Sequence, residues 1–364
     1  MEVEREFAGF ALPFAAGVAA SVLTAEHHHV HLSISASVSM AFAAICLLAL
    51  IHPCRKQLSD KTISLAVILA AFFSGMLCGY TSFLTGPGRI RSIPFSFLGD
   101  GMAEAIDRIP FRTNEANAVI KALITGNRQD IPQETIKAFR DSGASHILAL
   151  SGLHLGIIYS LIAKVLGITG NNQIAGRIRS ATTVILCGIY TLATGAGDSI
   201  VRAFLFIILG EAARHSGRPC DTGNLFFAAL AIQICIDPQS FRSVGFQLSY
   251  AAMAGIAFIY PWLKGLWSGT KEKKDIIRWI WDSASLSISC QLTTGPLAYM
   301  YFRTFPTHFL LTNLIALPLT GILIPFALIT LCLNALGICP GMLLRATEAL
   351  VKVLSEALRI ISEM

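Results

Sequence analysis

Charged residues are scarce in this chain. Asp, Glu, Lys and Arg together make up 14% of its 364 residues, hydrophobic residues make up 54%, and the mean hydropathy is +0.63. A soluble globular domain has about 25% charged residues, so this composition excludes that class. Apolar runs of roughly 18 residues or more, long enough to cross a bilayer as a helix, recur along the sequence. We therefore predict an all-α, polytopic transmembrane helix bundle with broken helices and interfacial amphipathic helices.

Signatures of nucleotide, redox and metal chemistry are also missing. No Gly-x-x-x-x-Gly-Lys-Ser/Thr loop occurs, so any energy source must lie outside the chain. The nine cysteines show no Cys-x-x-Cys spacing, and most fall in apolar runs, which favours a role as small buried hydrophobic residues. The histidines at 27–29 and 31 are interpreted as an interfacial loop first and an adventitious metal site second. We predict no metal site and no cofactor.

Hydropathy predicts the spanning segments and their direction. They are residues 7–25, 30–51, 62–85, 145–169, 180–195, 199–213, 222–236, 243–263, 276–301 and 309–335. Lys and Arg are concentrated in alternate loops, whereas the opposite short loops contain only Arg242 and Arg303. Because basic loops stay in the cytoplasm, the N-terminus is predicted to lie inside and the connection over 86–144 outside. The net charge of +6 follows from these loops and is weak evidence for a nucleic-acid partner.

The predicted segments divide the chain into four regions. These are N-terminal transmembrane helices (1–85), an extracytoplasmic helical connection (86–144), a transmembrane core (145–340) and a C-terminal amphipathic helix (341–364). In the connection, residues 95–109 present one apolar face, which is typical of an interfacial helix, and two short helices are predicted over Glu115–Thr125 and Pro132–Asp141. The C-terminal helix is expected along the membrane interface or against the bundle.

Polar groups interrupt the apolar segment that begins at Ser145. In one continuous helix, Ser145, Gly152 and Gly156 belong to a stripe of small residues, a typical contact surface for another membrane helix. Ser151 and His154 lie side by side on another face, where they need polar partners or water. The sequence thus predicts packing on one face of this helix and chemistry on the other.

Further candidate residues follow along the chain. Arg202 comes one helical turn after a glycine-rich break, and Asp198 can cap the new helix or pair with the guanidinium. Contact of Arg202 with a phosphate chain is an equal alternative. Gln247 favours an interhelical hydrogen bond. Asn313 lies beside the break expected at Pro318, where protein or a water-filled cavity must cover the irregular backbone.

Several motifs occur together in one order. They are Gly126-Asn-Arg-Gln-Asp-Ile-Pro132, Ala138-Phe-Arg-Asp-Ser-Gly143, Ser145-His-Ile-Leu-Ala-Leu-Ser-Gly-Leu-His-Leu-Gly156, Asp198-Ser-Ile-Val-Arg-Ala203, Asp237-Pro238, Val244-Gly-Phe-Gln-Leu-Ser249 and Asn313-Leu-Ile-Ala-Leu-Pro318. This series resembles the ComEC competence proteins, and the resemblance covers roughly residues 116–335. It implies that residues 145–340 are a competence-type core of an inner-membrane channel for transforming DNA.

The chain departs from that family in two places. Family members commonly carry an oligonucleotide-binding-like barrel in the outer connection, but the connection here lacks the alternating pattern that would build its strands. Many also continue into a metallo-β-lactamase-like domain with a His-x-His-x-Asp-His motif, which this sequence does not contain. We therefore expect a bare membrane core that is not an enzyme, with any strand-degrading nuclease on another polypeptide.

The resemblance implies a channel or permease core for uptake of single-stranded DNA during natural transformation. Its expected partners are single-stranded DNA, the lipid bilayer, a separate nuclease, a cytoplasmic DNA motor and further copies of the chain. The candidates for the DNA path are polar residues in apolar segments: Ser151, His154, Asp198, Arg202, Gln247 and Asn313. Two alternatives stay open, an intramembrane serine hydrolase with Ser151 as nucleophile and a small-solute transporter built on broken helices.

Overall fold

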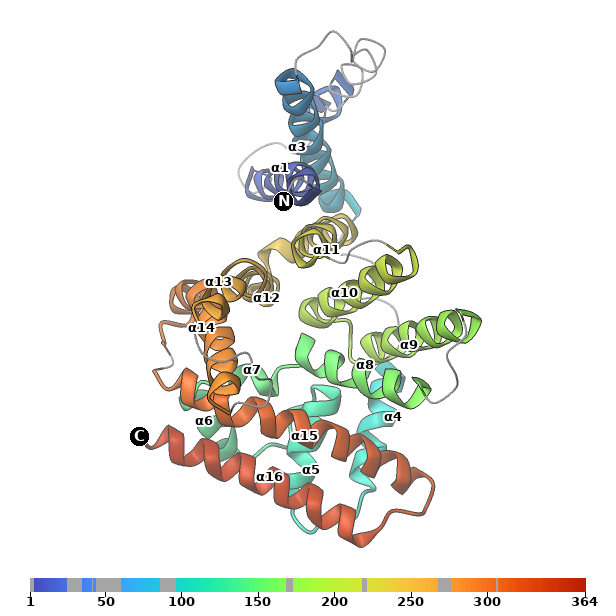
Figure 1. Ribbon diagram of the computed structural model, residues 1–364, viewed down its shortest axis with the longest axis vertical. Helices are drawn as coiled ribbons and strands as arrows, with labels where there is room; N and C mark the ends of the chain where they lie inside the picture. The colour runs from blue at the N-terminus through green and yellow to red at the C-terminus, as the bar shows by residue number, and fades with distance from the viewer. Residues whose placement is uncertain are drawn as a thin grey trace. The chain divides into compact units, whose positions relative to one another are not determined.

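The computed structural model describes residues 3–24, 35–40, 42–43, 60–85, 96–167, 173–217, 221–267, 276–305 and 307–364. Within these ranges the chain forms helices joined by turns and loops, with no β-strand, which confirms the all-α prediction. The chain divides into two compact units, Met1–Ile93 with Ile208–Tyr250 and Pro94–Ile207 with Ala251–Met364. Figure 1 labels the helices as they are named below.

The first unit is built on α1 (Val3–Thr24), α3 (Asp60–Thr85), α11 (Thr222–Ile236) and the 3-10 turn η3 (Pro238–Arg242). Helices α1 and α3 run parallel, because Phe14 lies against Gly75 and Ser21 lies against Gly79. A Cβ added at Gly75 would lie 2.1 Å from the carbonyl oxygen of Phe14. Close approach of these two helices therefore requires glycine at this crossing.

A parallel pair of helices needs a connection that returns the chain to its starting side. The predicted span over 30–51 would supply it, but only the helical residues 35–40 and 42–43 of that segment are described. The histidine cluster at 27–31 also lies outside the described residues. The interpretation of that cluster therefore stays a prediction.

The second unit holds most of the remaining helices. They are α4 (Ser96–Asp107), α5 (Asn114–Thr125), α6 (Gln133–Asp141), α7 (Ser145–Leu148), α8 (Gly152–Leu166), α9 (Gln173–Ala193), the first half of α10 (Asp198–His215), the end of α12 (Val244–Ala254), the π-turn η4 (Gly255–Ile259), α13 (Tyr260–Gly265), α14 (Ile276–Phe302), α15 (Phe309–Ala335) and α16 (Gly341–Ser362). The predicted break before Asp198 is confirmed, since Gly195 and Ala196 have φ values of 83° and 49°.

The core of this unit forms around α5, which is buried along most of its length. Leu123 of α5 packs in one cluster with Leu323 of α15 and Leu354 of α16. Helix α16 lies along α15 (Figure 1), and the hydroxyls of Thr330 and Thr347 are 3.0 Å apart near the turn between them. The C-terminal helix thus packs against the bundle, one of the two placements that its amphipathic pattern predicts.

Three helical stretches among the described residues are long and apolar enough to cross a membrane: Ile63–Ser82, Val244–Gly265 and Phe309–Ala335. Shorter apolar helices cover Ala8–Thr24, Gly152–Leu166 and Thr222–Ile236. Large apolar side chains are also exposed along α9 and α14, including Ile185, Ile189 and Leu292. Apolar surface of this extent indicates a membrane protein.

Candidate functional site

The polar stretch around Ser151 lies at a helix break. Helix α7 ends at Leu148 and α8 begins at Gly152, and between them Ala149 and Ser151 have extended backbone with ψ values of 129° and 168°. The prediction of one continuous helix over 145–169 is therefore wrong, and Ser145 shares no stripe with Gly152. The physical reason is that Ser151 occupies the N-cap position, whose extended backbone starts a new helix.

Ser151 and His154 form a capping box at the start of α8. The Ser151 Oγ lies 2.8 Å from His154 Nδ1, and the Ser151 backbone N–H donates to the same nitrogen over 3.3 Å. Because Nδ1 accepts from this N–H, the hydrogen-bond network assigns the imidazole proton to Nε2. Capping accounts for the contact from the backbone N–H. The contact between Oγ and Nδ1 is the one that a serine nucleophile would make, but a nucleophile would also need a third group to orient the imidazole.

The imidazole of His154 is buried, with only 1% of the residue exposed. Among the described residues its Nε2 has no hydrogen-bond partner. Leaving a buried donor unpaired costs about 1–3 kcal/mol, so this position favours water or another acceptor. The expectation that this face must meet polar partners or water stays a prediction for Nε2.

Arg202 lies directly against the first residue of α8. A Cβ added at Gly152 would be 3.2 Å from Arg202 Nη2, so the glycine leaves room for the guanidinium. Arg202 is 7% exposed, and Asp198 lies one helical turn before it at the start of α10. The structure therefore brings three of the predicted site residues, Ser151, His154 and Arg202, to the N-terminal end of α8.

A cavity of about 620 Å³ opens beside the same helix. Helices α8 and α15 line it with Gly152, Leu153, Gly156, Ile157, Ser160, Leu161, Lys164, Gly321 and Pro325. Most of this wall is apolar, and its one charged side chain is the lysine. Because Pro325 has no N–H, the carbonyl of Gly321, another residue of this wall, lacks the usual helical donor.

The other two predicted site residues lie on different segments. Asn313 is near the start of α15, beside Thr312, whose Oγ1 donates to the carbonyl of Ser142 over 2.7 Å. The Asn313 Oδ1 is buried and has no hydrogen-bond partner in the part of the chain that is described. Gln247 belongs to the first unit, where its Nε2 donates to the carbonyl of Phe241 over 3.0 Å.

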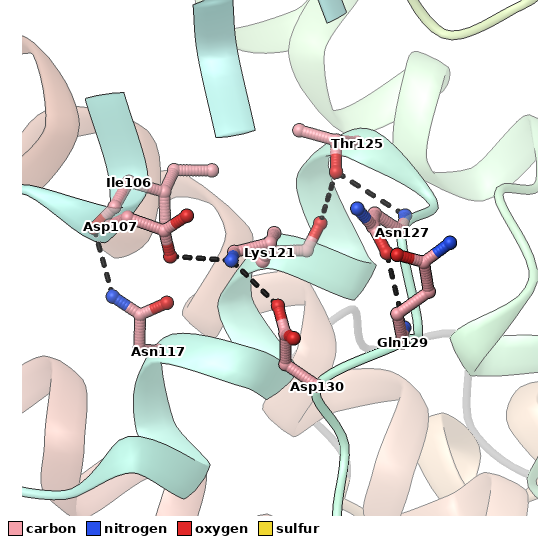
Figure 2. Close-up of polar contacts among 8 residues, drawn as sticks. All are labelled: Ile106, Asp107, Asn117, Lys121, Thr125, Asn127, Gln129 and Asp130. Atoms are coloured by element: carbon pink, nitrogen blue, oxygen red, sulfur yellow. Dashed lines mark hydrogen bonds and ion pairs between the residues drawn. The ribbon is translucent and has the colours of Figure 1, made fainter. Parts of the chain in front are cut away.

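A second polar cluster surrounds Lys121 (Figure 2), and the sequence reasoning missed it. The Lys121 side chain is 8% exposed, yet its Nζ lies 2.5 Å from Asp107 Oδ1 and 2.7 Å from Asp130 Oδ2. Burial acts to lower the pKa of Lys121, but hydrogen bonds to both aspartates outweigh it, so the pKa is raised. The signal in the sequence was a single lysine inside the otherwise apolar stretch Ala118–Ile124.

Short-range hydrogen bonds hold the loop that follows α5 (Figure 2). Thr125 Oγ1 donates to the carbonyl four residues earlier over 2.8 Å and accepts from the Asn127 N–H over 3.3 Å. Asn127 Oδ1 accepts from the Gln129 N–H over 3.1 Å. Gly126 ends α5 with a φ of 80°, a conformation that favours glycine. The motif that begins at Gly126 therefore shapes a loop that places Asp130 beside the buried lysine.

Comparison with known proteins places this site in a family. The family model described as Competence protein matches residues 123–364, which contain α8, Arg202 and the cavity. The chain belongs to this family. The resemblance of the sequence motifs to ComEC competence proteins is thereby confirmed.

Individual members of the Competence family are more distant. The chain is 27% identical over 227 residues to the uncharacterized protein YcaI of Escherichia coli, covering 61% of this chain and 30% of that protein. It is 24% identical over 241 residues to ComE operon protein 3 of Bacillus subtilis, covering 65% and 27%, and 25% identical over 218 residues to competence protein ComA of Neisseria gonorrhoeae, covering 58% and 30%. The matched region therefore covers less than a third of the length of each of these three relatives. No solved structure matches the chain.

The region matched by the Competence model contains Ser151 and Arg202, whereas Asp107 and Lys121 precede it. Within the described ranges, no group of three or more His, Cys, Asp and Glu side chains could hold a metal ion. The candidate site consists of the buried guanidinium of Arg202, the capping box of Ser151 and His154, and the apolar cavity beside α8.

Proposed function

We propose that this chain is the multi-pass membrane core through which single-stranded DNA passes during natural transformation. In this proposal it lies in the inner membrane as a polytopic bundle with its N-terminus in the cytoplasm. Support comes from membership in the Competence family and from the names of relatives such as competence protein ComA. The apolar helices and the alternation of basic loops support the membrane placement.

The observation that carries the proposal is the buried Arg202 at the start of α8. A charged side chain inside a membrane protein is costly and usually serves function. A guanidinium can hold a phosphate oxygen pair with two parallel hydrogen bonds, and the N-terminus of a helix also favours negative charge. One such contact in apolar surroundings would position a passing strand without trapping it, because most of the path would bind only weakly.

The proposal gives the other groups supporting roles. Ser151 and His154 set the start of α8 and thereby the position of Gly152 against the guanidinium, so no catalytic role is assigned to them. A separate nuclease would supply the single strand and a cytoplasmic motor would supply energy, since the sequence has no nucleotide-binding loop. Association of several copies in the membrane is also part of the proposal.

The test is uptake of a labelled single-stranded oligonucleotide into proteoliposomes that contain the purified chain. Arg202→Ala and Arg202→Lys are compared with Arg359→Ala, a matched control whose side chain is 64% exposed on α16. A lost charge-assisted hydrogen bond costs about 1.5–3 kcal/mol, so Arg202→Ala should lower uptake roughly tenfold to a hundredfold. Arg202→Lys should keep part of it, because charge remains but the bidentate geometry is lost.

The salt dependence of oligonucleotide binding separates phosphate contact from a structural role. Loss of one phosphate contact should reduce the slope of log affinity against log salt by about 0.7 for single strands. A small fluorescent anion and double-stranded DNA are measured alongside. Entry of the small anion without entry of single strands would replace the proposal with the solute-transporter alternative. An unchanged slope in folded Arg202→Ala would remove Arg202 from the path.

A further inference from the structure

Two cysteines that are far apart in the sequence meet between α3 and α11. The Cys78 thiol lies 3.8 Å from the carbonyl oxygen of Cys235. Cys78 is half-buried and Cys235 is exposed. Among the described cysteines only Cys187 is buried, so the interpretation of the cysteines as buried hydrophobic residues is wrong for this pair.

The contact has a simpler structural explanation, which is a helix cap. Cys235 lies in the last turn of α11, where carbonyl groups lack helical donors, and the Cys78 thiol can donate to one of them. A thiol is a weak donor, however, and serine would cap the helix more strongly. Capping also requires no thiol at position 235, so it leaves the second cysteine unexplained.

Neighbouring contacts hold the two helix ends in place. Directly after α11, Gln239 Nε2 donates to the carbonyl of Ser82 on α3 over 3.4 Å. Arg242 Nη2 donates to the carbonyl of Val22 on α1 over 2.8 Å, and the hydroxyls of Thr24 and Tyr80 join α1 to α3. These polar contacts all lie just beyond the two cysteines and hold the ends of α3 and α11 together, which keeps Cys78 and Cys235 near one another.

We propose that Cys78 and Cys235 form a disulfide that joins α3 to α11. The two thiols lose two protons and two electrons and gain one S–S bond, while the disulfide of an oxidised dithiol carrier takes up the electrons and becomes two thiols. The orientation in the proposed function places these helix ends on the outer side, where disulfides form and persist. That compartment rests on the proposed function, whereas the proximity of the thiols does not.

The experiment uses the full chain, purified in detergent, with a protease site inserted between residues 167 and 173. Cleavage separates a fragment with Cys78 from a fragment with Cys235, and a non-reducing gel shows whether they stay joined after treatment with glutathione disulfide. A variant that keeps only these two cysteines excludes other pairings. Cys78→Ser and Cys235→Ser are matched controls, since serine retains the hydrogen bond but cannot form the bridge.

The proposal expects most of the two-cysteine variant to migrate as one band after oxidation and as two bands after reduction. Both serine variants should give two bands under either condition. Separate fragments after oxidation of the folded two-cysteine variant would overturn the proposal, as would joined fragments in Cys78→Ser. Monodisperse elution before cleavage verifies folding. Because the readout is independent of DNA uptake and of orientation, failure here leaves the proposed function standing.

Discussion

Replacing Lys121 tests how much its buried ion pairs contribute to the stability of this fold. Lys121 is almost fully buried, while its partners Asp107 and Asp130 are about half exposed. The change Lys121→Met removes the charge that burial penalises and leaves two carboxylates that water can solvate. The double change Asp107→Asn with Asp130→Asn instead leaves a buried ammonium without its counter-charges. The two perturbations remove the same ion pairs but differ in what stays behind.

The magnitudes follow from that asymmetry. An unpaired buried charge costs about 3–5 kcal/mol, so we expect a loss of that size in the free energy of unfolding for the double aspartate variant. Lys121→Met should cost less, about 1–2 kcal/mol, because methionine fills the same apolar space and the remaining carboxylates are hydrated. The triple variant should recover part of the loss in the double variant, since no buried charge remains.

The assay is reversible unfolding in mixed detergent micelles, followed by circular dichroism, on the wild type and these three variants. Arg140→Met, which removes an exposed cation paired with Asp141, is the matched control and should change stability by less than about 1 kcal/mol. The reasoning is refuted if Lys121→Met is as destabilising as the double aspartate variant. It is also refuted if the triple variant is the least stable of the set.

Three further outcomes are expected. Gly75→Ala should destabilise the chain by about 1–3 kcal/mol, because its Cβ meets the α1 backbone. Gly9→Ala, with open space around it, should leave stability unchanged or raise it by up to about 1 kcal/mol in the same unfolding assay. Because the pKa of Lys121 is raised, its ion pairs should contribute fully to stability below the ordinary lysine pKa of about 10.4. In a pH series of melts, the difference in stability between wild type and Lys121→Met should therefore shrink only above that pH. Ser151→Ala should lower the free energy of unfolding by about 1 kcal/mol, because the N-cap is lost. Its reactivity toward a fluorophosphonate probe should equal that of wild type. Labelling of wild type that Ser151→Ala abolishes would instead indicate a nucleophile.

The fold class was predicted from hydropathy, and the family was predicted from the order of the sequence motifs. Long apolar runs predict helices because a backbone in lipid must satisfy its hydrogen bonds within one segment. The break before Asp198 was also readable, since glycines adopt the positive φ values that end a helix. The break at Ser151 was not foreseen, because apolar residues continue on both sides and the serine acts as a cap only once its backbone is extended.

The sequence by itself determined that this protein is helical and apolar and that it belongs with the competence proteins. Tertiary structure alone decided that Lys121 is buried between two aspartates, that Arg202 lies against Gly152, and that Cys78 meets Cys235. Each of these contacts joins residues from separate elements. Local periodicity reports which face of a helix is apolar, but which faces meet depends on packing of the whole unit.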